Sequence, residues 1–129
     1  MIERDGLPEI LIADDNPLMA RLLTEIVAAE GYLVAAVPCE SVVEAVVAAP
    51  PRLLLLDVLM PGVGGPEACR RLRADPRTRA VPIVFVSALP PGALAVQLEG
   101  CDYDALIAKP FDLAEVVATI RRLIAAPRP

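Results

Sequence analysis

Short apolar runs alternate with amphipathic stretches along the whole chain. The apolar runs occupy residues 10–13, 33–37, 53–56, 83–86 and 105–108, and each has the length of a strand. Apolar residues recur with helical spacing over residues 18–27, 41–49, 66–74 and 112–126, and a shorter helix is predicted to end near residue 99. Turn formers such as Gly31, Pro50 and Gly92 separate these elements. The pattern therefore predicts a strand followed by a helix, repeated five times.

This alternation predicts an α/β fold, in which a doubly wound five-stranded parallel sheet carries five helices on its two faces. The run 53–56 consists of leucine alone and is apolar on both faces, which is typical of a central strand. The length of 129 residues suits a single domain over residues 1–129, with a core from about 9 to 126. In such a sheet the functional site is expected beyond the carboxyl ends of the strands.

Polar residues follow four of the five predicted strands. Asp14 and Asp15 follow the first strand, Asp57 the third, Ser87 the fourth and Lys109 the fifth. The second strand ends without such a group. Lys109 is the only lysine among 12 basic residues, which indicates that a compact point charge is needed there.

Three carboxylates at one edge of a sheet repel one another. At 4 Å and an effective dielectric constant near 20, the repulsion is about 4 kcal/mol per pair, more than one lysine offsets comfortably. Mg²⁺ removes this repulsion, and it typically binds one or two carboxylates together with a phosphate oxygen. Asp57 is then the candidate nucleophile for an aspartyl phosphate, with Lys109 neutralising the transferring group and Ser87 donating a hydrogen bond to it.

Composition and charge argue against several classes of protein. The net charge is −5 and the arginines are spread along the chain, so direct nucleic-acid binding is not expected. No apolar run reaches the length of a membrane span and the acidic start is unlike a signal peptide, which together predict a soluble cytoplasmic protein. Cys39, Cys69 and Cys101 form no CxxC pair and the chain has no histidine, so we expect buried apolar thiols.

From about Glu9 to Ala126 the chain resembles the response-regulator receiver domain. The resemblance rests on four motifs, which are Asp14-Asp15-Asn16, Asp57-Val58-Leu59-Met60-Pro61 with Gly65, Ser87-Ala88, and Lys109-Pro110-Phe111. It implies the flavodoxin-like strand order 2-1-3-4-5 and a cis peptide bond between Lys109 and Pro110.

The resemblance also implies a role for each site residue. Asp57 resembles the phosphoacceptor, Asp14 and Asp15 the acidic pair that holds Mg²⁺, Leu59 the backbone-carbonyl ligand of that metal, Ser87 the switch hydroxyl, and Lys109 the phosphate partner.

Several positions depart from the family's pattern. Leu106 stands three residues before Lys109, where the family usually carries Tyr or Phe as a second switch element, and the nearest aromatic residue, Tyr103, lies three residues earlier. Gly100 lies nine residues before Lys109, where the family more usually has seven, while the spacing from Ser87 to Lys109 is ordinary, and this combination predicts a short fourth helix. Leu59 and Leu89 are both apolar at positions that flank the path of the hydrolytic water in the family, which predicts slow loss of the phosphoryl group.

The leading interpretation is a signalling switch and not an enzyme, since it would catalyse only its own phosphorylation and dephosphorylation. A histidine kinase or histidine phosphotransfer protein would supply the phosphoryl group, and a downstream protein target or output domain would read the change. Neither nucleic acid nor a membrane is expected as a partner, and a homodimer is a candidate assembly. The chain is either a free-standing receiver or one excised from a longer regulator or hybrid kinase.

There are three alternative interpretations. A phosphohydrolase of the haloacid-dehalogenase type would need Asp-x-Asp after the first strand, whereas Asp14 and Asp15 are adjacent. A flavin-binding electron carrier would want a hydroxyl-rich phosphate loop and flanking aromatic residues, of which the chain has few. A phosphorylation-independent interaction module is the third alternative.

Overall fold

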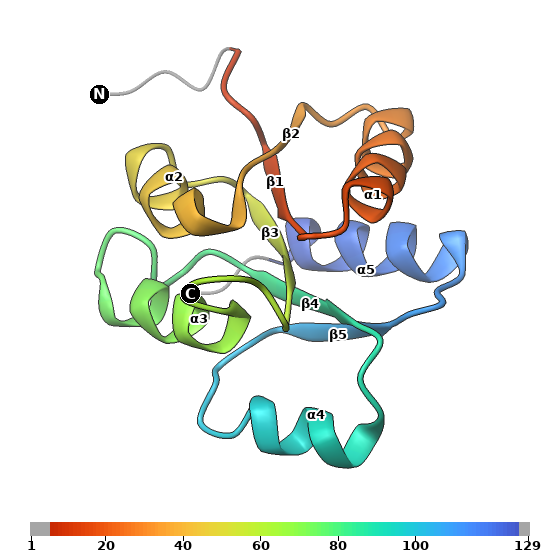
Figure 1. The fold of residues 1–129 in the computed structure, drawn as a ribbon. Helices are drawn as coiled ribbons and strands as arrows, with labels where there is room; N and C mark the ends of the chain where they lie inside the picture. Colours follow the sequence, from red (N-terminus) through yellow and green to blue (C-terminus); the bar gives the residue numbers. More distant parts are fainter. Residues whose placement is uncertain (1–5, 127–129) are drawn as a thin grey trace.

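The computed structural model describes residues 6–126, which form a five-stranded parallel sheet covered by helices (Figure 1). The strands are β1 (Ile10–Ala13), β2 (Val34–Ala36), β3 (Leu53–Asp57), β4 (Ile83–Ser87) and β5 (Ala105–Ala108). Their order in the sheet is β2-β1-β3-β4-β5. The predicted doubly wound α/β fold with strand order 2-1-3-4-5 is confirmed.

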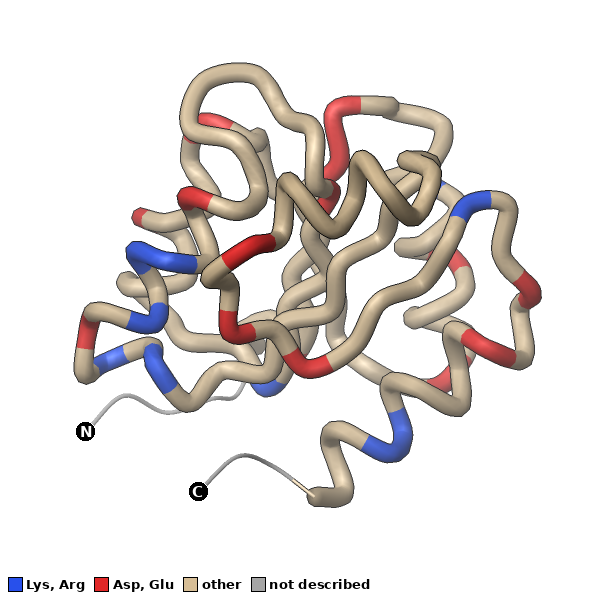
Figure 2. The backbone as a smooth tube through the Cα atoms, turned by 90° about the horizontal axis from the view of Figure 1, so that it is seen from below, with Lys and Arg blue, Asp and Glu red and all other residues tan. Residues whose placement is uncertain are grey.

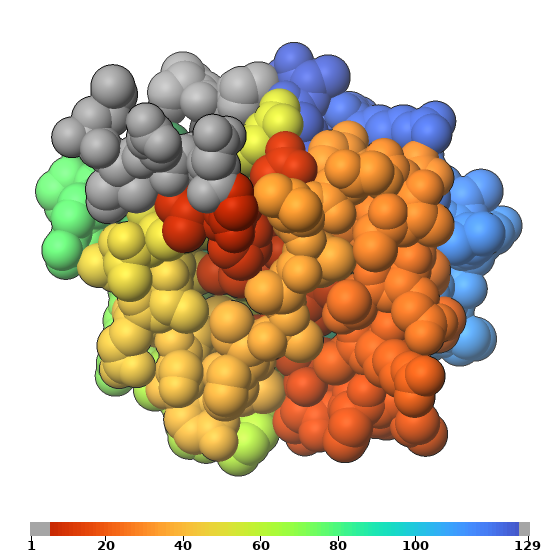
Figure 3. Space-filling model, turned by 90° about the horizontal axis from the view of Figure 1, so that it is seen from above, coloured from red at the N-terminus to blue at the C-terminus, as the bar shows by residue number. Residues whose placement is uncertain are grey.

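The helices lie in two layers. They are α1 (Pro17–Ala29), α2 (Val42–Ala48), α3 (Gly65–Ala74), α4 (Pro91–Gln97) and α5 (Leu113–Ala125), with a short 3-10 helix, η1 (Cys39–Ser41), before α2. Helices α1 and α5 cover one face of the sheet, and α2, α3 and α4 lie on the other (Figure 1). In the view from above, α1 and α2 lie on either side of β2 (Figure 3).

Strand β3 is buried along its whole length and holds the two layers together. Leu53 and Leu55 pack with residues of α1 and α5, whereas Leu54 and Leu56 pack with residues of α2 and α3. Each buried leucine stabilises the fold by about 1.5 to 3 kcal/mol. The predicted central strand is therefore confirmed, and it fixes Asp57 at its carboxyl end.

Element boundaries differ slightly from those predicted. Helix α1 continues to Ala29, and Gly31 follows with a φ of 92°, which a glycine adopts without strain. Strand β2 is shorter than the apolar run 33–37, because only its three central residues pair with β1. Helix α2 begins at Val42, after η1. The predicted short fourth helix is confirmed, since α4 has 7 residues.

Charged residues of both signs are mixed along the chain (Figure 2). In and after α3, where arginines are frequent, Arg71 pairs with Glu67 and Arg77 pairs with Asp75. None of the helices within residues 6–126 is long and apolar enough to cross a membrane.

Candidate functional site

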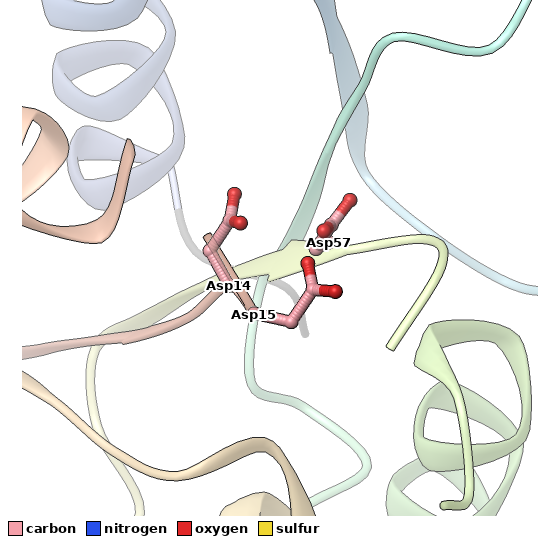
Figure 4. A group of neighbouring side chains, drawn as sticks. All are labelled: Asp14, Asp15 and Asp57. Atoms are coloured by element: carbon pink, nitrogen blue, oxygen red, sulfur yellow. The ribbon is translucent and has the colours of Figure 1, made fainter. Parts of the chain in front are cut away.

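Three carboxylates meet at the carboxyl ends of β1 and β3. Because the two strands are parallel neighbours with Ala13 opposite Leu56, the residues that follow them lie close together. One oxygen from each of Asp14, Asp15 and Asp57 lies within 4.8 Å of the other two. Figure 4 shows these side chains around the ends of the two strands. In the described part of the chain, no other group of three or more acidic, cysteine or histidine side chains is close enough to share a metal ion.

Asp14 is held by two contacts, one on each carboxylate oxygen. Its Oδ1 accepts a hydrogen bond of 2.9 Å from the backbone N–H of Asn16, and its Oδ2 lies 2.9 Å from Nζ of Lys109. Asn16 in turn caps α1, since its side-chain oxygen accepts from the N–H groups of Leu18 and Met19. The Asp14 side chain is only 2% exposed, so its orientation is fixed by the start of α1 and by Lys109.

Lys109 directly follows β5, and its side chain reaches the acidic residues. Its Nζ lies 2.9 Å from Oδ2 of Asp14 and 3.8 Å from Oδ1 of Asp57, and its side chain is 15% exposed. Its backbone N–H donates a 2.7 Å hydrogen bond to the carbonyl of Ser87. The Lys109-Pro110 peptide bond is cis, as the resemblance implied. One compact ammonium group therefore contacts two carboxylates.

Ser87 ends β4 one residue beyond Val86, which pairs with Asp57 across the sheet. Its side chain is buried, and its Oγ accepts a 3.0 Å hydrogen bond from the backbone N–H of Leu89. A hydroxyl that accepts one hydrogen bond still has a proton to donate. Ser87 can therefore donate to an anion at Asp57 while it holds Leu89.

Asp57 is the most perturbed carboxyl group of the site. Its pKa is raised from 3.8 to about 7, chiefly by burial and then by the charge of Asp14, with a smaller contribution from a hydrogen bond with Asp15, while the charge of Lys109 lowers it. Without further positive charge, the buried carboxyl group is therefore only about half ionised at neutral pH. The donor set fits a hard divalent cation, because it consists of carboxylate oxygens whose repulsion such a cation removes.

Gly65 lies directly against the strand end that carries Asp57. A Cβ atom on Gly65 would lie 2.1 Å from the backbone oxygen of Asp57 and 3.0 Å from Cε1 of Phe85. The N–H of Gly65 donates to the carbonyl of Val58 at 3.0 Å. The sequence showed Gly65 only as part of a family motif, because the hydrophobic pattern does not reveal how close two backbones lie.

The remaining predicted residues occupy different environments. Leu59 is 51% exposed beside the site, and the role of its carbonyl as a metal ligand stays a prediction. Cys39 and Cys69 are buried thiols as predicted, and burial raises the pKa of each to about 11. Cys101 is only partly buried.

Comparison with known proteins adds independent information. The chain matches the family model of the response regulator receiver domain over residues 10–121. It is 36% identical over 126 residues to the DNA-binding dual master transcriptional regulator RpaA of a Synechocystis species, covering 92% of this chain and 49% of that protein. It is 37% identical over 113 residues to the DNA-binding response regulator MtrA of Mycolicibacterium smegmatis, covering 87% and 48%. The chain thus spans about half the length of these curated relatives.

Solved structures of receiver domains are also similar to this chain. The receiver domain of sensor histidine kinase PA1611 from Pseudomonas aeruginosa aligns with a TM-score of 0.87 and 27% identity, covering 92% of this chain and 98% of that one. That structure has a magnesium ion coordinated in its active-site cleft. The signal receiver domain of a signal transduction histidine kinase from Syntrophus aciditrophicus aligns with a TM-score of 0.85 and 30% identity, covering 92% and 90%.

Proposed function

The chain belongs to the response regulator receiver family, and on that premise we propose that it is a phosphoacceptor switch of a two-component system, with Asp57 as the acceptor. The observation that carries this proposal is the meeting of Asp14, Asp15 and Asp57 with Lys109 at the carboxyl ends of β1, β3 and β5. We propose that residues 9–126 form one receiver domain, and that its chemistry is limited to its own phosphorylation and dephosphorylation.

Asp57 is the group that reacts. One of its carboxylate oxygens forms a bond to phosphorus while the bond from phosphorus to the donor's imidazole nitrogen breaks, and the electron pair of that bond stays on the nitrogen. Ser87 donates its hydroxyl proton in a hydrogen bond to a phosphoryl oxygen, and Lys109 places its ammonium group beside Asp57.

Mg²⁺ is the proposed cofactor, held by Asp14, Asp15, Asp57 and the backbone carbonyl of Leu59. When bound, it supplies the positive charge that keeps the three carboxylates ionised and offsets the charge of the phosphoryl oxygens. Two observations support this choice. The donor oxygens of the three carboxylates lie within 4.8 Å of one another, and the related PA1611 receiver domain has magnesium in its cleft.

The partners follow from the same proposal. A histidine kinase or histidine phosphotransfer protein supplies the phosphoryl group, in the cytoplasm where the kinase uses ATP. RpaA and MtrA are about twice as long as this chain and are DNA-binding proteins, so the phosphorylated receiver is proposed to act on an output domain or a separate protein target. Direct contact of this chain with nucleic acid is not part of the proposal, because its net charge is −5.

Intact-mass measurement after incubation with acetyl phosphate and Mg²⁺ tests the proposal. We expect a gain of one phosphoryl group in the wild type, no gain when EDTA replaces Mg²⁺, and no gain in Asp57→Asn. The amide of Asn has the shape of the carboxylate but is not an anionic nucleophile.

Each failure of this test has a separate meaning. A phosphoryl gain that persists in Asp57→Asn would place the acceptor elsewhere. No gain in a folded wild-type protein would favour a phosphorylation-independent interaction module. Rapid turnover of unrelated phosphoesters would instead indicate a phosphohydrolase.

A further inference from the structure

Tyr103 connects the buried core with the outer face of the sheet near α4. It lies in the loop before β5, and its side chain is 36% exposed. Its ring meets the ring of Phe85 edge-on, with centroids 5.6 Å apart and an interplanar angle of 72°. Phe85 is fully buried in β4. Tyr103 is thus in contact both with the core and with solvent.

Phe85 lies directly behind the strand end that carries the acceptor. Its Cε1 is 3.0 Å from the position that a Cβ atom on Gly65 would occupy, and that same position is 2.1 Å from the backbone oxygen of Asp57. The end of β3, the start of α3 and the Phe85 ring therefore meet around one point, and a close-packed interior transmits a shift at such a point to its neighbours. A change at Asp57 can therefore reach Tyr103 through one intervening ring.

A second route runs from the end of β4 to the same place. The N–H of Leu89 donates to Oγ of Ser87, so a displacement of this hydroxyl also displaces the backbone of Leu89. Leu89 and Tyr103 line one groove of about 540 Å³ between α4 and β5. Leu94, Leu98 and Leu106 also line it. Both routes therefore end at the groove that Tyr103 lines.

We propose that Tyr103 is the side chain through which the phosphorylation state of Asp57 changes the outer face of α4 and β5, an inference that rests on the proposed function. Leu106 pairs with Phe85 in the sheet register and is also 36% exposed, but it has no ring with which to follow a reorientation of Phe85. A modification shifts an equilibrium only through contacts that differ between two states. The ring pair provides such a contact.

Fluorine NMR of the whole chain labelled with 3-fluorotyrosine tests the inference. The chain has 2 tyrosines, and Tyr32 packs on the opposite face of the sheet, so it serves as an internal control. Beryllofluoride with Mg²⁺ mimics the phosphoryl group and gives its own bound fluorine signal. We expect the Tyr103 signal to move by more than its linewidth when this bound signal appears, while the Tyr32 signal stays in place.

Substitutions then distinguish an effect of the contact between the Phe85 and Tyr103 rings from an effect of other residues that line the groove. Phe85→Leu should remove the shift of Tyr103 while bound beryllofluoride is still seen, whereas Leu106→Ala, the matched control at the same groove, should leave the shift intact. In Tyr103→Ala, the change in amide exchange that beryllofluoride causes over α4 should be lost, and in Leu106→Ala it should persist.

The outcomes distinguish this inference from the function on which it rests. Bound beryllofluoride with an unmoved Tyr103 signal in the wild type would overturn the role of Tyr103 and leave the switch function standing, even if Phe85→Leu failed to fold. A shift of Tyr103 that is lost in Leu106→Ala but kept in Phe85→Leu would assign the coupling to Leu106. No bound beryllofluoride signal in a folded protein would overturn both proposals.

Discussion

Asp57 combines burial with two acidic neighbours, and its protonation therefore affects the stability of the fold. In the metal-free protein its pKa is raised from 3.8 to about 7, chiefly by burial and then by the charge of Asp14. Between these two values the folded chain binds a proton that the unfolded chain has lost. The stability contributed by the protonated group is therefore complete below about pH 4 and is lost as pH rises to about 7.

The resulting prediction compares the wild type with Asp57→Asn. From pH 4 to 7 in EDTA, the free energy of unfolding of the wild type should fall relative to that of Asp57→Asn by at most about 4 kcal/mol, because the amide does not titrate. Urea unfolding followed by circular dichroism at several pH values measures the difference. Parallel pH profiles for the two proteins would show that Asp57 is not perturbed as described.

Gly65 makes the approach of α3 to β3 sterically possible. In Gly65→Ala the new methyl group would lie 2.1 Å from the Asp57 backbone oxygen, so the end of β3 must shift. We expect a loss of about 1 to 3 kcal/mol in unfolding free energy and slower phosphorylation by acetyl phosphate. The matched control is Gly92→Ala in the first turn of α4, where a Cβ meets nothing within 4 Å, and the fold should gain about 0.4 to 1 kcal/mol because alanine has less freedom than glycine in the unfolded chain. Equal stability changes in the two variants would contradict this assignment.

At the scale of the elements, the sequence pattern was sufficient to predict the strands and the end of the sheet where the site lies. The leucine run of β3 has to be central because it is apolar on both faces, and the polar residues after β1, β3, β4 and β5 then lie at one edge. The pattern could not predict the length of β2, which depends on pairing with β1 and not on composition.

Side-chain contacts were less accessible to sequence reasoning. The sequence placed Lys109 near the phosphoacceptor, but only the geometry shows that its shorter contact is to Asp14. Truncation of a fully buried leucine at position 106 would cost roughly 2 to 5 kcal/mol. Because Leu106 is 36% exposed, truncation to Ala should cost only about 1 kcal/mol. Exposure at an edge strand depends on the covering helix, and α4 is short.

We expect the loop after β3 to influence the lifetime of the phosphorylated state. Leu59 is 51% exposed beside the site, so a polar side chain can replace it without loss of core packing. We expect Leu59→Asn to speed the loss of the phosphoryl group several-fold, because an amide can orient a water molecule for in-line attack and a leucine cannot. The decay of the phosphorylated mass after removal of acetyl phosphate measures this rate. Leu18→Asn is a suitable control, since Leu18 is an exposed leucine of α1. An identical lifetime in the wild type, Leu59→Asn and Leu18→Asn would contradict a role of Leu59 in hydrolysis.

At the scale of the whole molecule, the acidic site connects segments that are far apart in the sequence. Asp14 follows β1, Asp57 ends β3 and Lys109 follows β5, so a ligand of this site holds the sheet in its folded arrangement. A ligand that binds only the folded state raises its stability, by about 2.7 kcal/mol at a concentration of 100 times its dissociation constant. Mg²⁺ should therefore raise the melting temperature of the wild type.

Asp15→Asn and Asp14→Asn should separate charge repulsion from metal binding. Lys109 contacts Asp14 and Asp57 within the described residues but not Asp15, so Asp15→Asn removes one negative charge without breaking an ion pair. Asp15→Asn should raise the melting temperature in EDTA and weaken Mg²⁺ binding at least about tenfold. Asp14→Asn should also weaken Mg²⁺ binding, but it should not raise the melting temperature in EDTA, because Lys109 loses its 2.9 Å partner. Thermal unfolding in EDTA and along a Mg²⁺ titration measures both effects. An unchanged Mg²⁺ response in both variants would refute the metal site, and a larger gain for Asp14→Asn than for Asp15→Asn would refute the stabilising role of the Lys109 pair.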